Sequence, residues 1–366
     1  MYSILAVNPG STSTKIAWFH DDKPVWQDTV AHSSEELAQF ENMADQFELR
    51  SKAISDCVAK HENSFSELAA VVGRGGIVDP IPGGTYTVDE PLLKRLRVGK
   101  PWEHASNLGG IIAHAIASPL GLPSFIVDPV AVDELDEISK ITGLPGLNKP
   151  ALAHALNVKA TVRRAAKNLN KKWDEANFVV AHLGGGFTIC AHKAGRMIDI
   201  NSANEYGPFS PERAGGVPAK NLVDMCFSGK YTEQEIKKKL AGKGGSVAYL
   251  GTSDMREVRK MMESGGKLGE KASLIYRAMA WQVAKEISAQ AVSLSGKVDA
   301  ILFTGGIAYD NDFIRLIQER TGWIAPCLIY PGEGEMQALA EGALRVLKGE
   351  EGAKSYSENV KGSNIN

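Results

Sequence analysis

Residues 4–19 read Ile4-Leu5-Ala6-Val7-Asn8-Pro9-Gly10-Ser11-Thr12-Ser13-Thr14-Lys15-Ile16-Ala17-Trp18-Phe19. The apolar run before Asn8 and the β-branched and aromatic run after Lys15 predict two strands joined by a tight turn. Such a turn presents backbone N–H groups, hydroxyls and one ammonium group, a set that matches the charge and acceptor count of a phosphate. It is not a P-loop, because it lacks the Gly-x-x-x-x-Gly-Lys-Ser/Thr pattern and leads into a strand. Taken alone, the stretch is more often an ordinary hairpin with a Ser/Thr-rich loop.

The composition is that of a globular chain with room for two domains. Of its 366 residues, 43% are hydrophobic and 23% are charged. The 41 Lys and Arg nearly cancel the 43 Asp and Glu, so the chain has no overall basic field for nucleic acid or an anionic membrane. No apolar run reaches the roughly 20 residues that span a bilayer, and the start of the chain lacks a secretory leader pattern, so we expect a cytoplasmic protein. The four cysteines form no C-x-x-C pair and are expected to be reduced and structural.

Polar residues follow three predicted strands. Asn8 ends the first strand, Arg74 follows the apolar residues 68–72, and Asp128 follows the apolar residues 124–127. In an open α/β sheet the ligand crevice lies off the carboxyl ends of the strands, so we expect these three side chains to converge there. Each also has a simpler interpretation, since Arg74 fits a structural ion pair and Asp128, which precedes a proline, fits a turn.

The opening pattern recurs near the middle of the chain. Residues 178–191 again give an apolar strand, one polar residue (His182), a glycine turn at 184–186, and an alternating strand. The repetition predicts two related halves. A second histidine, His154, falls in the first turn of a helix predicted over residues 151–169. A lone histidine is more often a hydrogen-bonded core or capping residue than a catalytic one.

Further candidates follow in the second half. Arg213 stands beside glycines, and a strand predicted over 299–304 ends in Gly305-Gly306, where another molecule can approach the backbone closely. Glu333 and Glu335 precede an amphipathic helix and fit either a site or a solvated helix start. The sequence shows no zinc-ligand spacing, no Ser-His-Asp pattern and no Gly-x-Ser-x-Gly elbow.

In order and repetition these features resemble the acetate kinase branch of the superfamily that also holds actin, hexokinase and the heat-shock chaperone ATPases. The resemblance spans essentially the whole chain. Within the branch, the chain resembles the butyrate kinases most. The segments that carry it are 7–15 (VNPGSTSTK), 72–76 (VGRGG), 84–86 (GTY), 126–130 (IVDPV), 154–157 (HALN), 182–186 (HLGGG), 207–213 (GPFSPER), 254–256 (DMR) and 303–307 (FTGGI).

The resemblance implies an α/β fold of two actin-like (ribonuclease H-like) domains. Each has a mixed five-stranded sheet flanked by helices, and an ATP cleft lies between them. We expect residues 1–149 with 338–366 to form the first domain, on the acid-substrate and phosphate side, and residues 150–337 to bind the nucleotide. It further implies a homodimer or higher homo-oligomer, ATP or ADP with Mg²⁺ as cofactors, a short-chain carboxylic acid and its acyl phosphate as partners, and neither nucleic acid nor membrane.

Carried over residue by residue, the resemblance assigns three sets of binding residues. The β- and γ-phosphates are expected near Asn8, Ser11, Ser13 and Lys15 from one domain and Gly184, Gly185 and Gly186 from the other. The adenosine is expected against Asp254, Met255, Arg256, Gly305, Gly306 and Ile307. The metal is assigned to Asn8, Asp128 and Glu335, with Glu333 as the alternative to Glu335.

The chemistry can be argued independently of the family. A carboxylic acid is already ionised at neutral pH, so its attack on a γ-phosphoryl group needs no strong base. The obstacle is to bring two anions together, and catalysis is therefore positioning plus cationic clamps. Arg74 and Arg213 suit the clamps, since a guanidinium holds a carboxylate or phosphoryl oxygens bidentately. His154 and His182 are expected to donate hydrogen bonds to the same oxygens, and Asp128 to hold Mg²⁺ or its water shell.

The expected reaction is butyrate plus ATP to butyryl phosphate plus ADP, reversibly and by direct in-line transfer. Acetate kinases place a phenylalanine where this chain has Ala153, and a smaller wall predicts a longer apolar pocket. Butyrate kinases often keep a bulky residue there too, so acetate, propionate and branched acids stay open as alternatives. An alternative of another class is an actin-like ATPase that phosphorylates no carboxylate.

Overall fold

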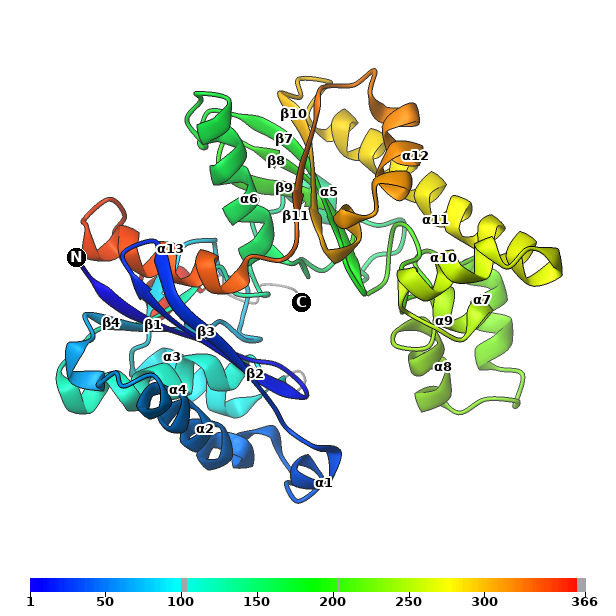
Figure 1. Cartoon of the computed structure of the whole chain (residues 1–366). Helices are drawn as coiled ribbons and strands as arrows, with labels where there is room; N and C mark the ends of the chain where they lie inside the picture. The colour runs from blue at the N-terminus through cyan, green and yellow to red at the C-terminus, as the bar shows by residue number, and fades with distance from the viewer. Residues whose placement is uncertain (100–103, 203, 361–366) are drawn as a thin grey trace. The chain divides into compact units, whose positions relative to one another are not determined.

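The computed structural model describes residues 1–99, 104–202 and 204–360. The chain divides into two compact units, Met1–Asp133 with Gly334–Asn366 (unit 1) and Glu134–Glu333 (unit 2) (Figure 1). Each unit contains one mixed β-sheet flanked by helices, which confirms the predicted pair of actin-like α/β folds. The finer domain limits at residues 149 and 337 stay a prediction, and residues 361–366 of the predicted first domain lie outside the described residues.

The sheet of unit 1 has the strand order β3-β2-β1-β4-β6-β5. Its strands are β1 Ser3–Pro9, β2 Ser13–His20, β3 Lys23–Ala31, β4 Ala70–Arg74, β5 Thr85–Thr87 and β6 Ser124–Val127. Strands β1, β4 and β6 are parallel neighbours, whereas β2 pairs antiparallel with β1 in the predicted hairpin. The short strand β5 pairs antiparallel with β6 and adds a sixth strand to the expected five.

Helices cover both faces of this sheet (Figure 1). Helix α13 (Glu335–Leu347) contacts β1, β4 and β6 on one face, and α4 (Asn107–Ala117) contacts the same strands on the other. On the α4 face, Leu5 and Val7 of β1 are buried with Leu108 and Ile112 of the helix. The remaining helices are α1 Ser34–Leu37, η1 Met43–Gln46, α2 Phe47–Lys60, η2 Phe65–Glu67, α3 Glu90–Val98, η3 Ser118–Leu120 and α14 Tyr356–Asn359.

The sheet of unit 2 repeats this plan with the order β11-β10-β7-β8-β9. Its strands are β7 Asn177–Leu183, β8 Phe187–Lys193, β9 Arg196–Ile200, β10 Ala300–Gly305 and β11 Cys327–Pro331. Strand β7 pairs antiparallel with β8 and parallel with β10, as β1 pairs with β2 and β4. The two related halves predicted from the repeated sequence pattern are therefore confirmed at the level of topology.

Helices also flank the second sheet, and the long helix α11 (Gly266–Ser293) contacts β7, β8 and β9. The others are α5 Glu137–Lys140, α6 Ala155–Asn168, α7 Ala219–Cys226, α8 Glu233–Leu240, α9 Gly245–Leu250, α10 Met255–Glu263, η4 Gly306–Tyr309 and α12 Asn311–Thr321. Helix α6 begins after His154, so the prediction of a helix from residue 151 is wrong. The backbone N–H of His154 donates to the hydroxyl of Thr188 in β8, and this contact holds His154 at the N-cap position, outside the helix.

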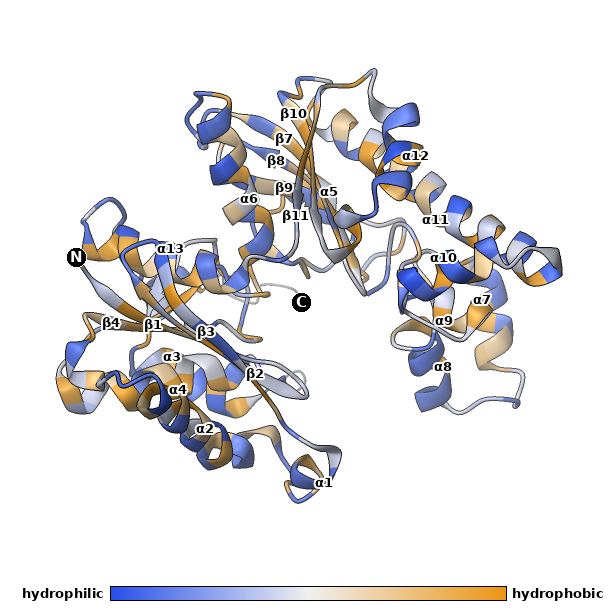
Figure 2. Ribbon diagram, viewed as in Figure 1, coloured by the Kyte–Doolittle hydropathy of each residue, from blue (hydrophilic) through white to orange (hydrophobic). Residues whose placement is uncertain are grey.

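The apolar residues concentrate in the central strands of both sheets (Figure 2). Residues 4–7 of β1 and 300–303 of β10 are completely buried. This continuous burial is the pattern of parallel strands that are covered on both faces. Near the carboxyl ends of these central strands the apolar runs give way to Asn8 in β1 and His182 in β7.

Candidate functional site

The first turn, residues 8–15, is stabilised by a buried arginine, Arg50, that was not predicted from the sequence. Strand pairing places Asn8 opposite Lys15, and the backbone N–H of Gly10 donates to the Ser13 carbonyl at 2.7 Å. Arg50 of α2 is fully buried and donates to the Ser13 carbonyl and to the Thr14 hydroxyl, each at 3.0 Å. The sequence feature that could have identified Arg50 is its position as a charged residue on the apolar face of an amphipathic helix.

Beside this turn, Glu335 joins two residues from neighbouring strands. Asn8 Nδ2 donates to Glu335 Oε2 at 2.7 Å, and Arg74 Nη1 forms an ion pair with Glu335 Oε1. The side chains of Arg74 and Glu335 are 10% and 16% exposed, so the pair is largely shielded from water. Burial raises the pKa of Glu335, but the Arg74 charge and the hydrogen bonds outweigh it and hold the pKa below 4.5. Glu335 is therefore a carboxylate at the first residue of α13, where the helix dipole favours it.

Asp128 lies directly after β6, next to the strand that ends in Arg74. Its backbone has a φ of +38°, which is rare for a residue with a side chain, and the side chain is 3% exposed. Its Oδ1 accepts the backbone N–H of Gly84 at 2.7 Å, and its own N–H donates to the Gly84 carbonyl at 3.0 Å. Backbone strain of this kind clusters at functional sites. The structure thus brings Asn8, Arg74 and Asp128 to the carboxyl ends of three adjacent parallel strands, as the sequence predicted.

Oxygen donors in unit 1 fit a magnesium ion. Mg²⁺ prefers oxygen ligands and is commonly held by one or two carboxylates together with substrate phosphates. Glu335 is ionised, and both Glu335 and Asp128 stand at the same edge of the sheet. Among the described residues, no group of three or more His, Cys, Asp or Glu side chains is placed to hold a metal ion by itself.

The second turn, residues 182–188, has a different surrounding. A Cβ on Gly186 would collide with the guanidinium of Arg213, so that cation lies directly on the turn's backbone. The Ser210 hydroxyl donates to the Gly185 carbonyl at 2.7 Å, which fixes the turn from the same loop. Burial lowers the pKa of Arg213, while Glu212 acts in the opposite direction.

The two candidate histidines lie together on this turn. The rings of His154 and His182 are stacked with centroids 4.1 Å apart and an interplanar angle of 16°. His154 Nδ1 is 2.8 Å from the Thr188 hydroxyl, and His182 Nδ1 is 2.7 Å from Asn157 Oδ1. Asn157 ends the HALN segment (residues 154–157), and its contact with His182 was not predicted from the sequence.

A cavity of about 760 Å³ opens beside the second turn within unit 2. It brings together most of the residues predicted for the nucleotide with several that were not. The lining includes Gly184, Gly185, Asp254, Met255, Arg256, Gly306, Ile307, Tyr309, Asp310 and Glu333. Gly305, which precedes the lining residue Gly306, packs closely against the backbone of Leu183, with which an added Cβ would collide.

Asp254 starts the helix that forms one wall of the cavity. Its carboxylate accepts the backbone N–H of Arg256 at 2.9 Å and pairs with the Arg256 guanidinium at 2.7 Å. These interactions lower the pKa of Asp254 to about 2. Asp254 is thus the N-cap of α10.

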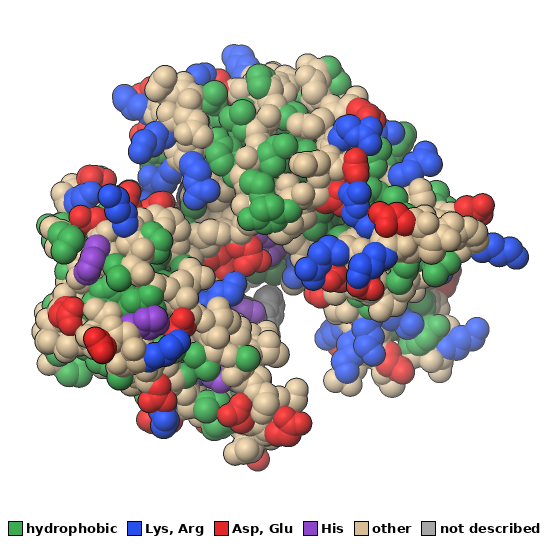
Figure 3. All heavy atoms as spheres, viewed as in Figure 1, with side chains coloured by type: hydrophobic (Ala, Val, Ile, Leu, Met, Phe, Trp, Pro, Cys, Tyr) green, Lys and Arg blue, Asp and Glu red, His purple; other side chains and the backbone are tan. Residues whose placement is uncertain are grey.

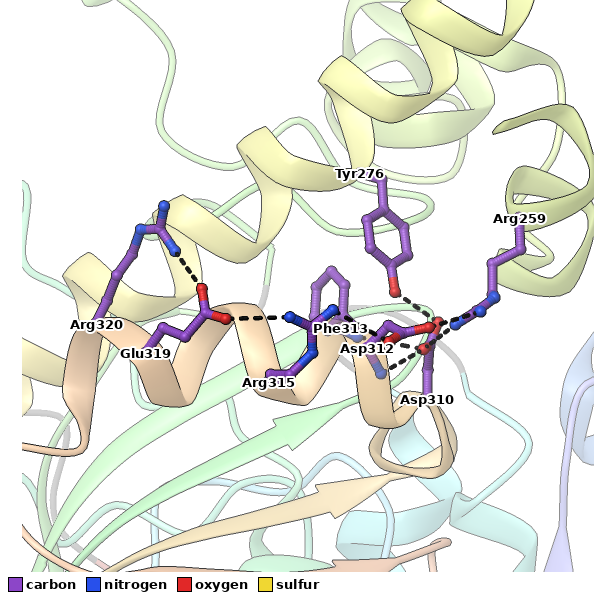
Figure 4. Close-up of polar contacts among 8 residues, drawn as sticks. All are labelled: Arg259, Tyr276, Asp310, Asp312, Phe313, Arg315, Glu319 and Arg320. Atoms are coloured by element: carbon purple, nitrogen blue, oxygen red, sulfur yellow. Dashed lines mark hydrogen bonds and ion pairs between the residues drawn. The ribbon is translucent and has the colours of Figure 1, made fainter. Parts of the chain in front are cut away.

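A second part of the lining is an ion-pair network that was not predicted from the sequence (Figure 4). Arg259 of α10 reaches Asp310 at 2.6 Å and Asp312 at 2.7 Å. The Tyr276 hydroxyl donates to Asp310 at 2.8 Å, and burial together with that carboxylate raises the pKa of Tyr276. Asp310 also caps α12 by accepting the backbone N–H groups of Asp312 and Phe313. The network ties α10, α11 and α12 together around the cavity.

The outer surface around α10 carries both signs of charge (Figure 3). Lys260 pairs with Glu257 at 2.9 Å, beside the Arg256 and Asp254 pair. Basic residues there are thus balanced by acidic neighbours. None of the helices that the structure describes is long and apolar enough to cross a bilayer.

Residues 153–320 match the model of the acetokinase family. This match contains the unit 2 candidates, from His154 through the second turn and Arg213 to the Gly305-Gly306 turn. Among solved structures, the fold is similar to acetate kinase from Porphyromonas gingivalis, with 17% identity, a TM-score of 0.76, and coverage of 94% of this chain and 99% of that one. It is also similar to acetate kinase from Entamoeba histolytica, with 18% identity, a TM-score of 0.75, and coverage of 93% of this chain and 98% of that one. A propionate kinase from Francisella tularensis is similar too, with 18% identity, a TM-score of 0.71, and coverage of 93% of this chain and 99% of that one. At these identities the structural likeness establishes the shared fold.

Proposed function

We propose that this protein is an ATP-dependent kinase of short-chain carboxylates, which forms an acyl phosphate and ADP. The observation that carries the proposal is the acetokinase match over the same residues that surround the cavity and the second turn. A glycine turn with a guanidinium against its backbone suits phosphate, and the adjoining cavity has room for a nucleoside.

In this proposal unit 1 supplies the charged part of the machinery. Lys15, Ser11, Ser13 and Asn8 bind phosphate oxygens, and Arg74 holds the acid or the transferring phosphoryl group. Asp128 and Glu335 hold Mg²⁺ or its water shell; the contacts of Glu335 with Asn8 and Arg74 favour it over Glu333, which lines the cavity of unit 2. When bound, Mg²⁺ supplies charge neutralisation at the phosphates.

Unit 2 supplies the nucleotide cavity and a second set of groups around the phosphates. Asp254, Met255, Arg256, Gly306 and Ile307 contact the adenosine, and Gly305 shapes the wall. Gly184, Gly185 and Gly186 offer backbone N–H groups to phosphate, with Arg213, His154 and His182 beside them. The acid attacks as its carboxylate in an in-line displacement, so these groups orient and stabilise charge and no strong base takes part.

Butyrate is the proposed acid. Ala153 is buried beside His154 and is small where acetate kinases carry a phenylalanine, which favours a longer substrate. Each extra methylene that the pocket buries contributes about 0.8 kcal/mol. Comparison of kcat/KM for acetate, propionate, butyrate and isobutyrate tests this choice, and a clear preference for acetate would exclude butyrate as the main substrate. We propose in addition a homodimer or higher homo-oligomer in the cytoplasm.

Trapping with hydroxylamine tests the reaction class. The purified protein with ATP, Mg²⁺ and butyrate is expected to give butyryl hydroxamate in proportion to the ADP formed. The fold also suits an actin-like ATPase, which would release inorganic phosphate and give no hydroxamate. The buried Arg74 beside the first turn favours the kinase, because a guanidinium there matches a carboxylate substrate.

A further inference from the structure

The two stacked histidines have hydrogen-bond partners that differ in kind. His154 faces a hydroxyl, which can donate or accept, whereas His182 faces an amide oxygen, which can only accept. A neutral imidazole carries one proton, on either Nδ1 or Nε2, and the partner at one nitrogen decides which. The two rings therefore need not carry their protons on the same atom.

Thr188 determines the proton position on His154. The Thr188 hydroxyl is fully buried and already accepts the backbone N–H of His154 at 3.3 Å. Its own proton needs an acceptor, and among the described residues the one within its reach is His154 Nδ1, at 2.8 Å. A buried hydroxyl that donates to no acceptor is unfavourable. Nδ1 of His154 is thus the acceptor, and in the neutral ring the proton is on Nε2.

Asn157 determines the opposite arrangement on His182. The Nδ2 group of Asn157 donates to the carbonyl oxygens of Glu333 and Gly332, both of which only accept. This fixes the orientation of the amide and turns Oδ1 toward His182 Nδ1, at 2.7 Å. His182 is 3% exposed, so water does not easily replace this contact. Nδ1 of His182 is the donor, and in the neutral ring Nε2 carries the lone pair.

The structure assigns Thr188 and Asn157 as positioning residues that hold His154 and His182 in opposite tautomers. A donor to an anionic oxygen needs an N–H group, and His154 then presents one at Nε2 while its ring is neutral. Neutral His182 presents an acceptor at Nε2, on the side of Gly184, where an added Cβ would come within 3.3 Å of that nitrogen. The inference rests on the proposed function for its consequence in catalysis, namely that His154 is the neutral donor to the phosphoryl oxygens.

Nitrogen-15 NMR of the whole protein tests the assignment directly. The chain has eight histidines, so a sample labelled only in histidine gives a tractable spectrum. Peaks are assigned with His154→Gln and His182→Gln. Above the range in which imidazoles titrate, we expect a protonated Nε2 on His154 and a protonated Nδ1 on His182. The same tautomer on both rings, or the reverse pair, would overturn the assignment.

Variants separate positioning from general structure. Thr188→Val removes the hydroxyl donor and is expected to mix the His154 tautomers, whereas Thr188→Ser keeps them. Asn157→Leu is expected to mix the His182 tautomers. Asn157→Asp keeps an acceptor and is expected to retain the proton on His182 Nδ1. In kinetics, Thr188→Val should lower kcat about tenfold with little change in the KM for ATP, and serine should restore it. Unchanged tautomers in Thr188→Val would contradict the role of Thr188.

Thr321→Val is the matched control, because Thr321 is equally buried in unit 2 but donates to a carbonyl of its own helix. It is expected to leave both rings and kcat unchanged. The NMR readout does not depend on the reaction. Opposite tautomers in a protein that forms no acyl phosphate would remove the proposed function alone, and equal tautomers in an active kinase would remove this inference alone.

Discussion

The first and second turns occupy equivalent places in their sheets, yet their surroundings differ. Each joins a central parallel strand to its antiparallel neighbour, and Asn8 opposite Lys15 in the first corresponds to His182 opposite Thr188 in the second. Around the first turn lie ionised partners, the Arg74 and Glu335 pair. Around the second lie stacked imidazoles, an amide and a hydroxyl, with Arg213 on the glycine backbone.

In the proposed function, this difference equips one topology for two tasks. Ionised groups in unit 1 suit the metal and the carboxylate, where charge must be balanced. In unit 2, glycine backbone with the Arg213 guanidinium suits phosphate oxygens, and the cavity suits a nucleoside, where close approach and direction matter. The predictions below change one turn and use the other as reference.

The largest effect is expected from the two arginines. Arg74→Ala and Arg213→Ala should each lower turnover by at least ~10²-fold, by analogy with the loss of one oxyanion donor. Steady-state kinetics with ATP and butyrate measure it. The exposed Arg277 serves as control, and Arg277→Ala should stay near wild type. Near wild-type turnover in either test variant would remove that arginine from the mechanism.

The ion pair of the first turn predicts a loss of stability. Glu335→Gln leaves the Arg74 charge without its carboxylate partner and should lower the free energy of unfolding at pH 7 by about 2 kcal/mol, somewhat less than for a fully buried pair. Because the pKa of Glu335 is lowered on folding, its contribution is present above pH 4.5 and is lost as the pH falls through the folded-state pKa. Denaturant titrations of both proteins at several pH values test this. A difference that persists unchanged well below pH 4.5 would contradict the assignment.

Matched glycine substitutions compare the two turns directly. Gly186→Ala places a methyl group against the Arg213 guanidinium and should lower kcat/KM about tenfold or more by displacing that cation. Gly10→Ala meets only the Ser13 carbonyl at 3.5 Å and hydroxyl at 3.7 Å, which are ordinary contacts, and should be tolerated. Equal effects of the two substitutions would show that close backbone approach does not distinguish the turns.

The smallest effect is expected in the cavity wall of unit 2. Tyr276→Phe removes the hydrogen bond to Asp310 and should lower the free energy of unfolding by about 1 kcal/mol. Denaturant titration measures the change, and Tyr249→Phe at a half-exposed position is the control. A loss no greater than that of the control would mean that the hydrogen bond from Tyr276 to Asp310 does not stabilise the fold.

The sequence predicted the elements whose information is local. The hairpin at residues 8–15, its repeat at residues 182–188 and the polar ends of β1, β4 and β6 follow from apolar runs broken by glycine and polar residues. The edge strands β3, β9 and β11 were not predicted. They are stabilised by pairing with a neighbouring strand, and the local sequence pattern does not reveal that pairing.

The site was only partly predictable for the same reason. Arg50, Asn157 and Thr188 act on the turns through contacts with residues distant in sequence. The start of α6 was misplaced because a hydrogen bond to β8, absent from any local pattern, holds His154 outside the helix. The predicted roles of the site residues await the kinetic tests above.

Phosphorus NMR of the complete reaction tests the central claim most directly. With ATP, Mg²⁺ and butyrate, the account predicts that the γ-phosphate signal of ATP is replaced by an acyl phosphate signal in step with the signals of ADP. Appearance of inorganic phosphate from the first time point, with ADP and without an acyl phosphate, would contradict it.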